Sequence, residues 1–206
     1  AVGGTSIAPD YNASKGRFWS AAPEWLAQAK PTSDGGNSLL LSFIQEIDMC
    51  IDKTLSRLKD GYQIDAFLWH QGESDYAKSK DYYLNLKTMV AYVRMHLTEK
   101  TGKDYSRLPF IFGTVARSNK YFSREVENAM KQLAAEDPNM HLIDMSGAEL
   151  LNDRLHFTAH SAEYLGQQVY KQLEQIIKGV TVRTDELKGK RLGIIGDSYV
   201  KNHKEP

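Results

Sequence analysis

Segments of helical and strand-like periodicity alternate along this chain, and that alternation most limits the folds it can adopt. Apolar residues recur at helical spacing over four segments, residues 39–59, 81–99, 124–135 and 162–177. Short apolar runs typical of buried strands lie between them, at 64–69, 109–115 and 140–144. Strands separated by helices of this length require right-handed crossovers. We therefore expect an α/β fold, a three-layer α/β/α domain with a parallel sheet.

The composition narrows the kinds of partner. At 206 residues and 41% apolar, the chain is long enough for one sizeable core. Its 26 Lys and Arg balance its 26 Asp and Glu, so no bulk charge directs it to nucleic acid or to an anionic membrane. No apolar window approaches the ~20 residues of a membrane span. A neutral substrate fits this composition best.

An apolar strand opens directly into a polar loop at residues 66–75, which read Ala-Phe-Leu-Trp-His-Gln-Gly-Glu-Ser-Asp. In open parallel sheets, ligands bind beyond the carboxyl ends of the strands. His70 and Gln71 are therefore expected at the rim of a binding site, with residues 114–116 beside them.

A second polar cluster, Asp-Arg-Leu-His-Phe-Thr at 153–158, has an Asp-x-x-His spacing. A carboxylate at Asp153 can orient His156 as a general base and stabilise its charged form, which points to ester hydrolysis. Two other interpretations stay open. One is an ordinary loop carboxylate beside a surface imidazole, and the other is a metal site made by Asp153, His156 and His160.

Together with Ala-Val-Gly-Gly-Thr-Ser at 1–6, these clusters resemble the sialate O-acetylesterase and carbohydrate esterase family 6 branch of the SGNH hydrolases, over about residues 1–178. The resemblance implies a flavodoxin-like SGNH hydrolase fold, a serine nucleophile, and no metal or organic cofactor. It implies that Asp153 is the partner of His156. It also implies that Gln71 and a backbone N–H of Gly3 or Gly4 form the oxyanion hole.

The other polar residues of the 66–75 loop have structural interpretations. Two carboxylates in one acidic turn, Glu73 and Asp75, are expected to hold the loop in shape, or alternatively to cap the helix that begins near residue 81. His70 is expected to shape the loop through hydrogen bonds. A sugar-binding role or a plain core role is open for four aromatic residues, Trp19, Trp25, Tyr82 and Tyr83.

The family's nucleophile lies in a Gly-Gln-Ser-Asn segment that this chain lacks. The best-placed serine of this chain, Ser198, lies eight residues before the end of the sequence. The segment around it resembles the opening of a GDSL-type SGNH hydrolase. We expect a linker at 179–190 and the first strand of a second, tandem domain at 191–206. Alternatively, that strand completes the first domain, as in a circular permutation, and brings Ser198 to His156. Ser6 and Ser74 are the next candidates.

We therefore expect a serine carboxylic ester hydrolase of the SGNH type that removes acetyl groups from sugars or sialic acid. A catalytically inactive carbohydrate-binding or scaffolding domain is the alternative. An adjacent domain or chain is a candidate partner that supplies the missing first strand. Without a nucleophile at the family's position, poor hydrolysis of small acetyl esters is expected. The resemblance alone suggests a secreted or periplasmic location.

Overall fold

The computed structural model of the chain describes residues 3–9, 16–181 and 190–197. The α-helices are α1 (Pro23–Leu26), α2 (Leu39–Lys53), α3 (Tyr82–Thr101), α4 (Arg124–Glu136) and α5 (Ala159–Thr181). The strands are β1 (Tyr62–His70), β2 (Phe110–Gly113), β3 (Met140–Ile143) and β4 (Lys190–Asp197). Three 3-10 segments are η2 (Thr32–Asp34), η3 (Leu55–Arg57) and η4 (Glu73–Asp81).

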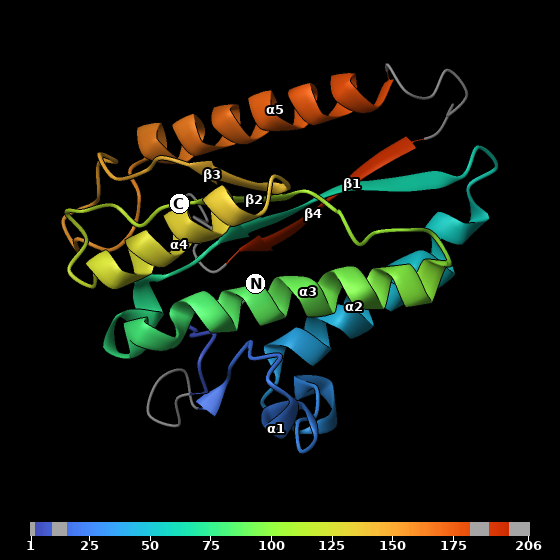
Figure 1. The fold of residues 1–206 in the computed structure, drawn as a ribbon, viewed down its shortest axis with the longest axis horizontal. Helices are drawn as coiled ribbons and strands as arrows, with labels where there is room; N and C mark the ends of the chain where they lie inside the picture. Colours follow the sequence, from blue (N-terminus) through green and yellow to red (C-terminus); the bar gives the residue numbers. More distant parts are fainter. Residues whose placement is uncertain (1–2, 10–15, 182–189, 198–206) are drawn as a thin grey trace, which may run out of the picture.

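The strands form one parallel sheet in the order β3-β2-β1-β4. Helices cover both of its faces: α5 runs along one face, and α2 and α3 lie on the other (Figure 1). The predicted three-layer α/β/α fold with a parallel sheet is therefore confirmed. All strands point the same way, so the loops that follow β1, β2 and β3 leave the sheet at one edge, the carboxyl edge.

Alternate residues of each strand face different helices and divide the core in two. Phe67 and Phe110 pair across β1 and β2, and their rings meet edge to face with centroids 5.0 Å apart on the side of α2, α3 and α4. Ala66 and Ile111 face the other way and pack with Leu165 and neighbouring apolar residues of α5. Burial on both faces explains why the strands are continuously apolar rather than alternating.

Two predicted helices differ from the structure by three residues or more at one or both ends. The helix expected over 39–59 ends at Lys53, because Thr54 leaves helical geometry (φ −125°, ψ −61°) and the chain continues as η3. The last helix begins earlier than expected, at Ala159, where the Thr158 hydroxyl accepts the Ser161 N–H at 3.3 Å and caps the first turn. Among the described residues, no helix is both long enough and apolar enough to cross a membrane.

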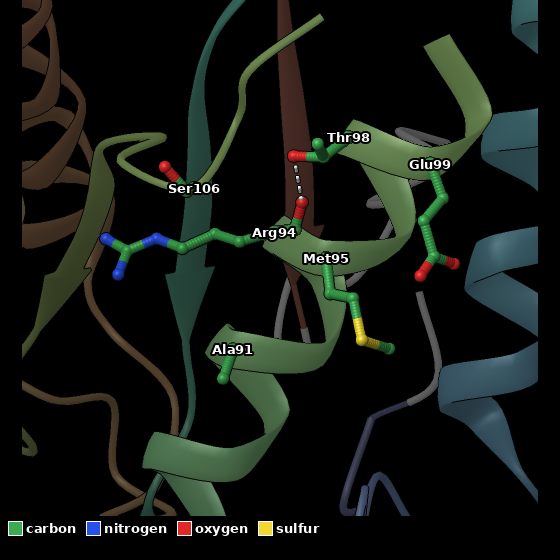
Figure 2. A pocket seen from close by; sticks show the side chains of 6 residues that line it. All are labelled: Ala91, Arg94, Met95, Thr98, Glu99 and Ser106. Carbon is green, nitrogen blue, oxygen red and sulfur yellow. Dashed lines mark hydrogen bonds between the residues drawn. The ribbon is translucent and has the colours of Figure 1, made fainter. Parts of the chain in front are cut away.

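Arg94 joins α3 to the segments that enter β2 and β3. Its Nε donates to the Leu108 carbonyl at 3.0 Å, and its Nη1 lies 2.6 Å from Oδ2 of Asp137. The side chains of this ion pair are 13% and 28% exposed. The residue also lines a pocket of about 430 Å³ on the outer face of α3, together with Met95 and Ser106 (Figure 2).

Replacing Arg94 by glutamine is expected to lower the free energy of unfolding at pH 7 by about 2 kcal/mol, between the values for exposed and buried pairs. Partial burial raises the pKa of Asp137, but hydrogen bonds from Arg94 and Asn139 outweigh it and the net pKa is lowered. Ionised Asp137 thus stabilises the fold above the ordinary carboxyl pKa, and this contribution is lost as the pH falls through the lowered value.

Urea unfolding at several pH values would measure both effects. The variant should be less stable at pH 7, and its stability should depend less on pH below about 5 than that of the parent chain. The control is Lys87→Gln, which removes an exposed pair with Glu136 and should leave stability unchanged. Equal effects of the two substitutions would contradict the structural role given to Arg94.

Candidate active site

His70 ends β1 and is packed tightly at the carboxyl edge. Its ring lies 5.0 Å from the ring of Phe157, centroid to centroid, and its Nε2 is 3.7 Å from Oε1 of Glu73. Gly113 ends the neighbouring strand, and a Cβ there would lie 3.0 Å from His70 Nδ1. The lack of a side chain at Gly113 therefore makes room for the imidazole, which contacts the loop that carries His156.

That loop holds Asp153 and His156 in contact, as their spacing predicts. Oδ1 of Asp153 accepts the backbone N–H groups of Leu155 and His156 at 3.0 and 3.1 Å, and Oδ2 lies 2.5 Å from His156 Nδ1. The turn is closed by Arg154, whose N–H donates to Leu151 and whose φ is 55°. Backbone hydrogen bonds within the turn thus fix the orientation of the carboxylate that contacts the imidazole.

The electrostatics of the pair suit a general base. The hydrogen bond from His156, with those of two backbone N–H groups, holds the pKa of Asp153 well below its usual range, so the carboxyl stays ionised. An ionised Asp153 accepts the Nδ1–H of the ring, which leaves Nε2 as the basic nitrogen of His156. The side chains are 24% exposed for His156 and 43% for Asp153, so the pair is accessible from solvent.

Gln71 and Asp75 form a buried link to the N-terminal segment. The Asp75 carboxylate accepts the N–H groups of Ile7 and Ala8 at 2.9 and 3.0 Å. Nε2 of Gln71 donates to the same carboxylate at 2.5 Å and to the Thr5 carbonyl at 3.2 Å. Both amide protons of Gln71 are thus engaged within the fold, and an oxyanion role would require one of these bonds to be exchanged. That role stays a prediction.

The glycines named for the oxyanion hole lie next to this link. Gly4 has a φ of 71°, as expected for a turn that favours glycine, and it precedes Thr5, whose carbonyl meets Gln71. Gly3 is exposed and Gly4 is half-buried. The structure therefore brings the glycine turn to Gln71, and the donation of either N–H to a substrate oxygen stays a prediction.

The acidic residues after β1 do not cap α3. Asp75 is occupied by the N-terminal segment, Glu73 lies beside His70, and Asp81 precedes α3 without a side-chain cap. Gly72 allows the chain to turn here, with a φ of 150°, and a Cβ at this position would lie 2.8 Å from Cγ2 of Val115. The backbone of the loop therefore packs directly against the end of the neighbouring strand.

The predicted nucleophile, Ser198, lies outside the described residues. The strand before it pairs with β1, and Asp197 stands opposite His70 in the parallel register. Of the other candidate serines, Ser6 is buried and donates to the Ala8 carbonyl at 2.6 Å, whereas Ser74 is partly exposed. The origin of β4, in a second domain or in this one, stays a prediction.

A metal site and an aromatic cleft were the remaining sequence interpretations. In the parts of the chain that the structure describes, no group of three His, Cys, Asp or Glu side chains could hold a metal ion. Trp19 and Tyr82 are buried, so a core role holds for both of them, and Trp25 packs edge to face on Phe18. The pocket beside Arg94 is lined by residues of α3 and by Ser106, and no residue of the loop that carries Asp153 and His156 lines it.

Two residues at the carboxyl edge escaped the sequence interpretation. The rings of Tyr76, in η4, and Tyr121, in the loop after β2, stack with centroids 4.9 Å apart and are partly exposed. Ligands bind beyond the carboxyl ends of the strands in open parallel sheets, which is why residues 114–116 were expected near the site. The same argument could have included Lys120 and Tyr121, which follow the same buried strand. Only the fold shows that Tyr76 and Tyr121 meet.

Comparisons with known proteins agree with the fold. Residues 1–175 match the family described as carbohydrate esterase, sialic acid-specific acetylesterase. The X-ray structure of the Arabidopsis thaliana protein AT4G34215, at 1.6 Å resolution, is similar with a TM-score of 0.52 and 26% identity. The match covers 67% of this chain and 53% of that one, so this chain spans about half the length of that protein.

No curated protein matches the chain. The family match nevertheless extends over most of the sequence and includes the polar loop after β1 and the Asp153–His156 pair. The chain therefore belongs to the carbohydrate esterase, sialic acid-specific acetylesterase family.

Proposed function

We propose that this chain is a serine carbohydrate O-acetylesterase, which hydrolyses acetyl esters of sugars or of sialic acid. The observation that carries the proposal is the contact of 2.5 Å between Asp153 and His156, in a loop packed on the carboxyl end of β1. A carboxylate that holds one imidazole nitrogen and leaves the other basic is what acyl transfer to a serine requires.

In this mechanism Ser198 attacks the acetyl carbonyl while His156 Nε2 takes its proton. Asp153 keeps the ring in the required tautomer and stabilises the imidazolium. When the tetrahedral intermediate collapses, His156 returns the proton to the sugar oxygen, which leaves as the alcohol. Water then attacks the acetyl-serine with His156 again as the base, and acetate is released.

The pairing of β4 with β1 supports Ser198 as the nucleophile. Asp197 stands opposite His70, whose ring contacts Phe157, the residue after His156. Adjacent strands lie ~4.8 Å apart, and the next residue follows within 3.8 Å. A nucleophile that follows β4 would thus start from the same edge of the sheet as the Asp153–His156 pair, as the circular-permutation alternative requires.

The proposal is tested by the hydrolysis of 4-nitrophenyl acetate and of an acetylated pyranoside by the full chain, compared with Ser198→Ala. The sequence alone predicts poor hydrolysis, but because β4 pairs with β1 we now expect turnover by the parent chain and a loss of three or more orders of magnitude in the variant. Turnover unaffected by Ser198→Ala would assign the nucleophile elsewhere, with Ser74 the next to replace. No turnover at all, with binding of the acetylated sugar retained, would favour an inactive carbohydrate-binding domain.

A further inference from the structure

We propose that Tyr76 and Tyr121 form a sugar-stacking subsite beside the Asp153–His156 pair, on which one face of the substrate's pyranose ring packs. The inference rests on the proposed esterase function and assigns the place where the sugar, rather than the acetyl group, is held. Neither tyrosine takes part in the proton transfers described above.

The two rings make an unusual surface feature. They come from η4 and from the loop after β2, and they stack at an interplanar angle of 28° with their centroids 4.9 Å apart. Tyr76 is 49% exposed and Tyr121 36%. Other exposed tyrosines of the described residues, Tyr164 and Tyr170 on α5, make no such ring contact. The two rings therefore form one continuous aromatic surface, whereas the tyrosines of α5 are isolated exposed side chains.

The pair is tied to the loop that carries the candidate general base. The backbone N–H of Lys120 donates to the Arg154 carbonyl at 3.1 Å. The buried Asn119 donates through Nδ2 to the Leu155 carbonyl at 3.2 Å. Tyr121 thus follows directly on a segment that is hydrogen-bonded to the two residues preceding His156. A substrate held on this ring would have its ester groups near the imidazole.

On its other side the pair adjoins the loop after β1. Tyr76 follows Asp75, which is fixed by the N–H groups of Ile7 and Ala8. That buried attachment restrains the backbone from which the Tyr76 ring projects. Both rings are therefore carried by segments that are anchored on either side of the candidate site, and an anchored surface loses little freedom when a ligand binds.

The chemistry of the surface favours a sugar. A pyranose ring presents a patch of C–H groups on one face and hydroxyls around its rim, and a tyrosine offers an apolar ring face with a hydroxyl at its edge. Lys120 adds a cation, with Nζ 5.3 Å from the centroid of the Tyr121 ring, as a hydrogen-bond donor to sugar hydroxyls.

The test compares Tyr76→Ala and Tyr121→Ala with the parent chain on an acetylated pyranoside and on 4-nitrophenyl acetate. We expect kcat/KM for the sugar ester to fall about tenfold relative to kcat/KM for the small ester, mainly through KM. Tyr121→Phe should retain most of the stacking. Tyr170→Ala, which removes a 67% exposed tyrosine three turns into α5, is the control and should leave the ratio unchanged.

A purely structural role for the pair would give a different result. If the two rings only staple their loops together, both substrates should lose activity in parallel and the ratio should stay constant, which would overturn the subsite. Calorimetric titration of the acetylated pyranoside into His156→Ala, with and without Tyr121→Ala, measures binding without turnover. This measurement tests the subsite even if the proposed hydrolysis fails. Binding by His156→Ala that is lost when Tyr121→Ala is added supports the subsite, and equal binding by the two variants overturns it.

Discussion

His156→Ala is expected to lower kcat/KM for acetyl ester hydrolysis by three or more orders of magnitude. In the proposed mechanism the imidazole first takes the serine proton and later returns it to the leaving sugar, so its loss affects both steps. Its ring is held by Asp153 at 2.5 Å. Initial rates on 4-nitrophenyl acetate, measured for the parent chain and the variant at equal folded concentration, give the result directly.

The same mechanism also predicts how substitutions combine. Members of a catalytic unit act together, so His156→Ala combined with Ser198→Ala should lose little more activity than either substitution alone. Asp153→Asn, which favours the wrong tautomer of the imidazole, should also lose about three orders of magnitude. The matched control is His160→Ala, an exposed histidine at the start of α5, whose removal should have little effect. Losses that simply multiply would contradict a shared mechanism.

Asp75→Ala is expected to lower the free energy of unfolding by about 3 kcal/mol, because it leaves the buried N–H groups of Ile7 and Ala8 without their acceptor. Gln71 Nε2 loses its contact of 2.5 Å at the same time. Urea unfolding measures the change, and hydrogen exchange at Ile7 and Ala8 should accelerate more than exchange in β1. Asp81→Ala serves as the control, since Asp81 is exposed and makes no side-chain cap.

The dependence of folding stability on pH distinguishes the hydrogen bonds of Asp75 from the ionisation of its carboxyl. Burial raises the pKa of its carboxyl, although hydrogen bonds from Ala8, Ile7 and Gln71 partly offset that effect. A raised folded pKa means that the stabilising contribution is complete below the unfolded value near 4 and declines as the pH rises through the folded value. Asp75→Asn, which cannot ionise, should lack this decline. A parent chain that gains stability over the same interval would contradict this assignment.

The fold could be predicted because its information is periodic and local. The apolar spacing over residues 81–99 and 124–135 needs no distant partner to be recognised, and α3 and α4 lie there with shifts of one or two residues at their ends. The Asp153–His156 contact was predictable for the same reason. Its two members are three positions apart and share one turn closed by its own backbone hydrogen bonds.

The remaining features depend on tertiary packing that leaves no periodic signal. The bond between Ile7 and Asp75 spans 68 positions in the sequence. The stack of Tyr76 on Tyr121 depends on how two separate loops leave the sheet. The engagement of both Gln71 amide protons is likewise visible only once the N-terminal segment is seen to lie beside β1. Each is a contact between segments whose individual sequences look like ordinary loops.

The pairing of β4 with β1 bears on how this chain reaches its native state. More than one hundred residues separate Tyr62 from its partner Lys190, so β1 is synthesised long before the strand that covers its outer edge. Until β4 arrives, β1 presents a row of unpaired N–H and C=O groups along an apolar strand, which is a template for intermolecular strand addition. Long-range parallel pairing is also slow to form. The interval between the emergence of the two strands is therefore when the chain is most prone to aggregate, and dilution or cooling during expression should increase the soluble yield.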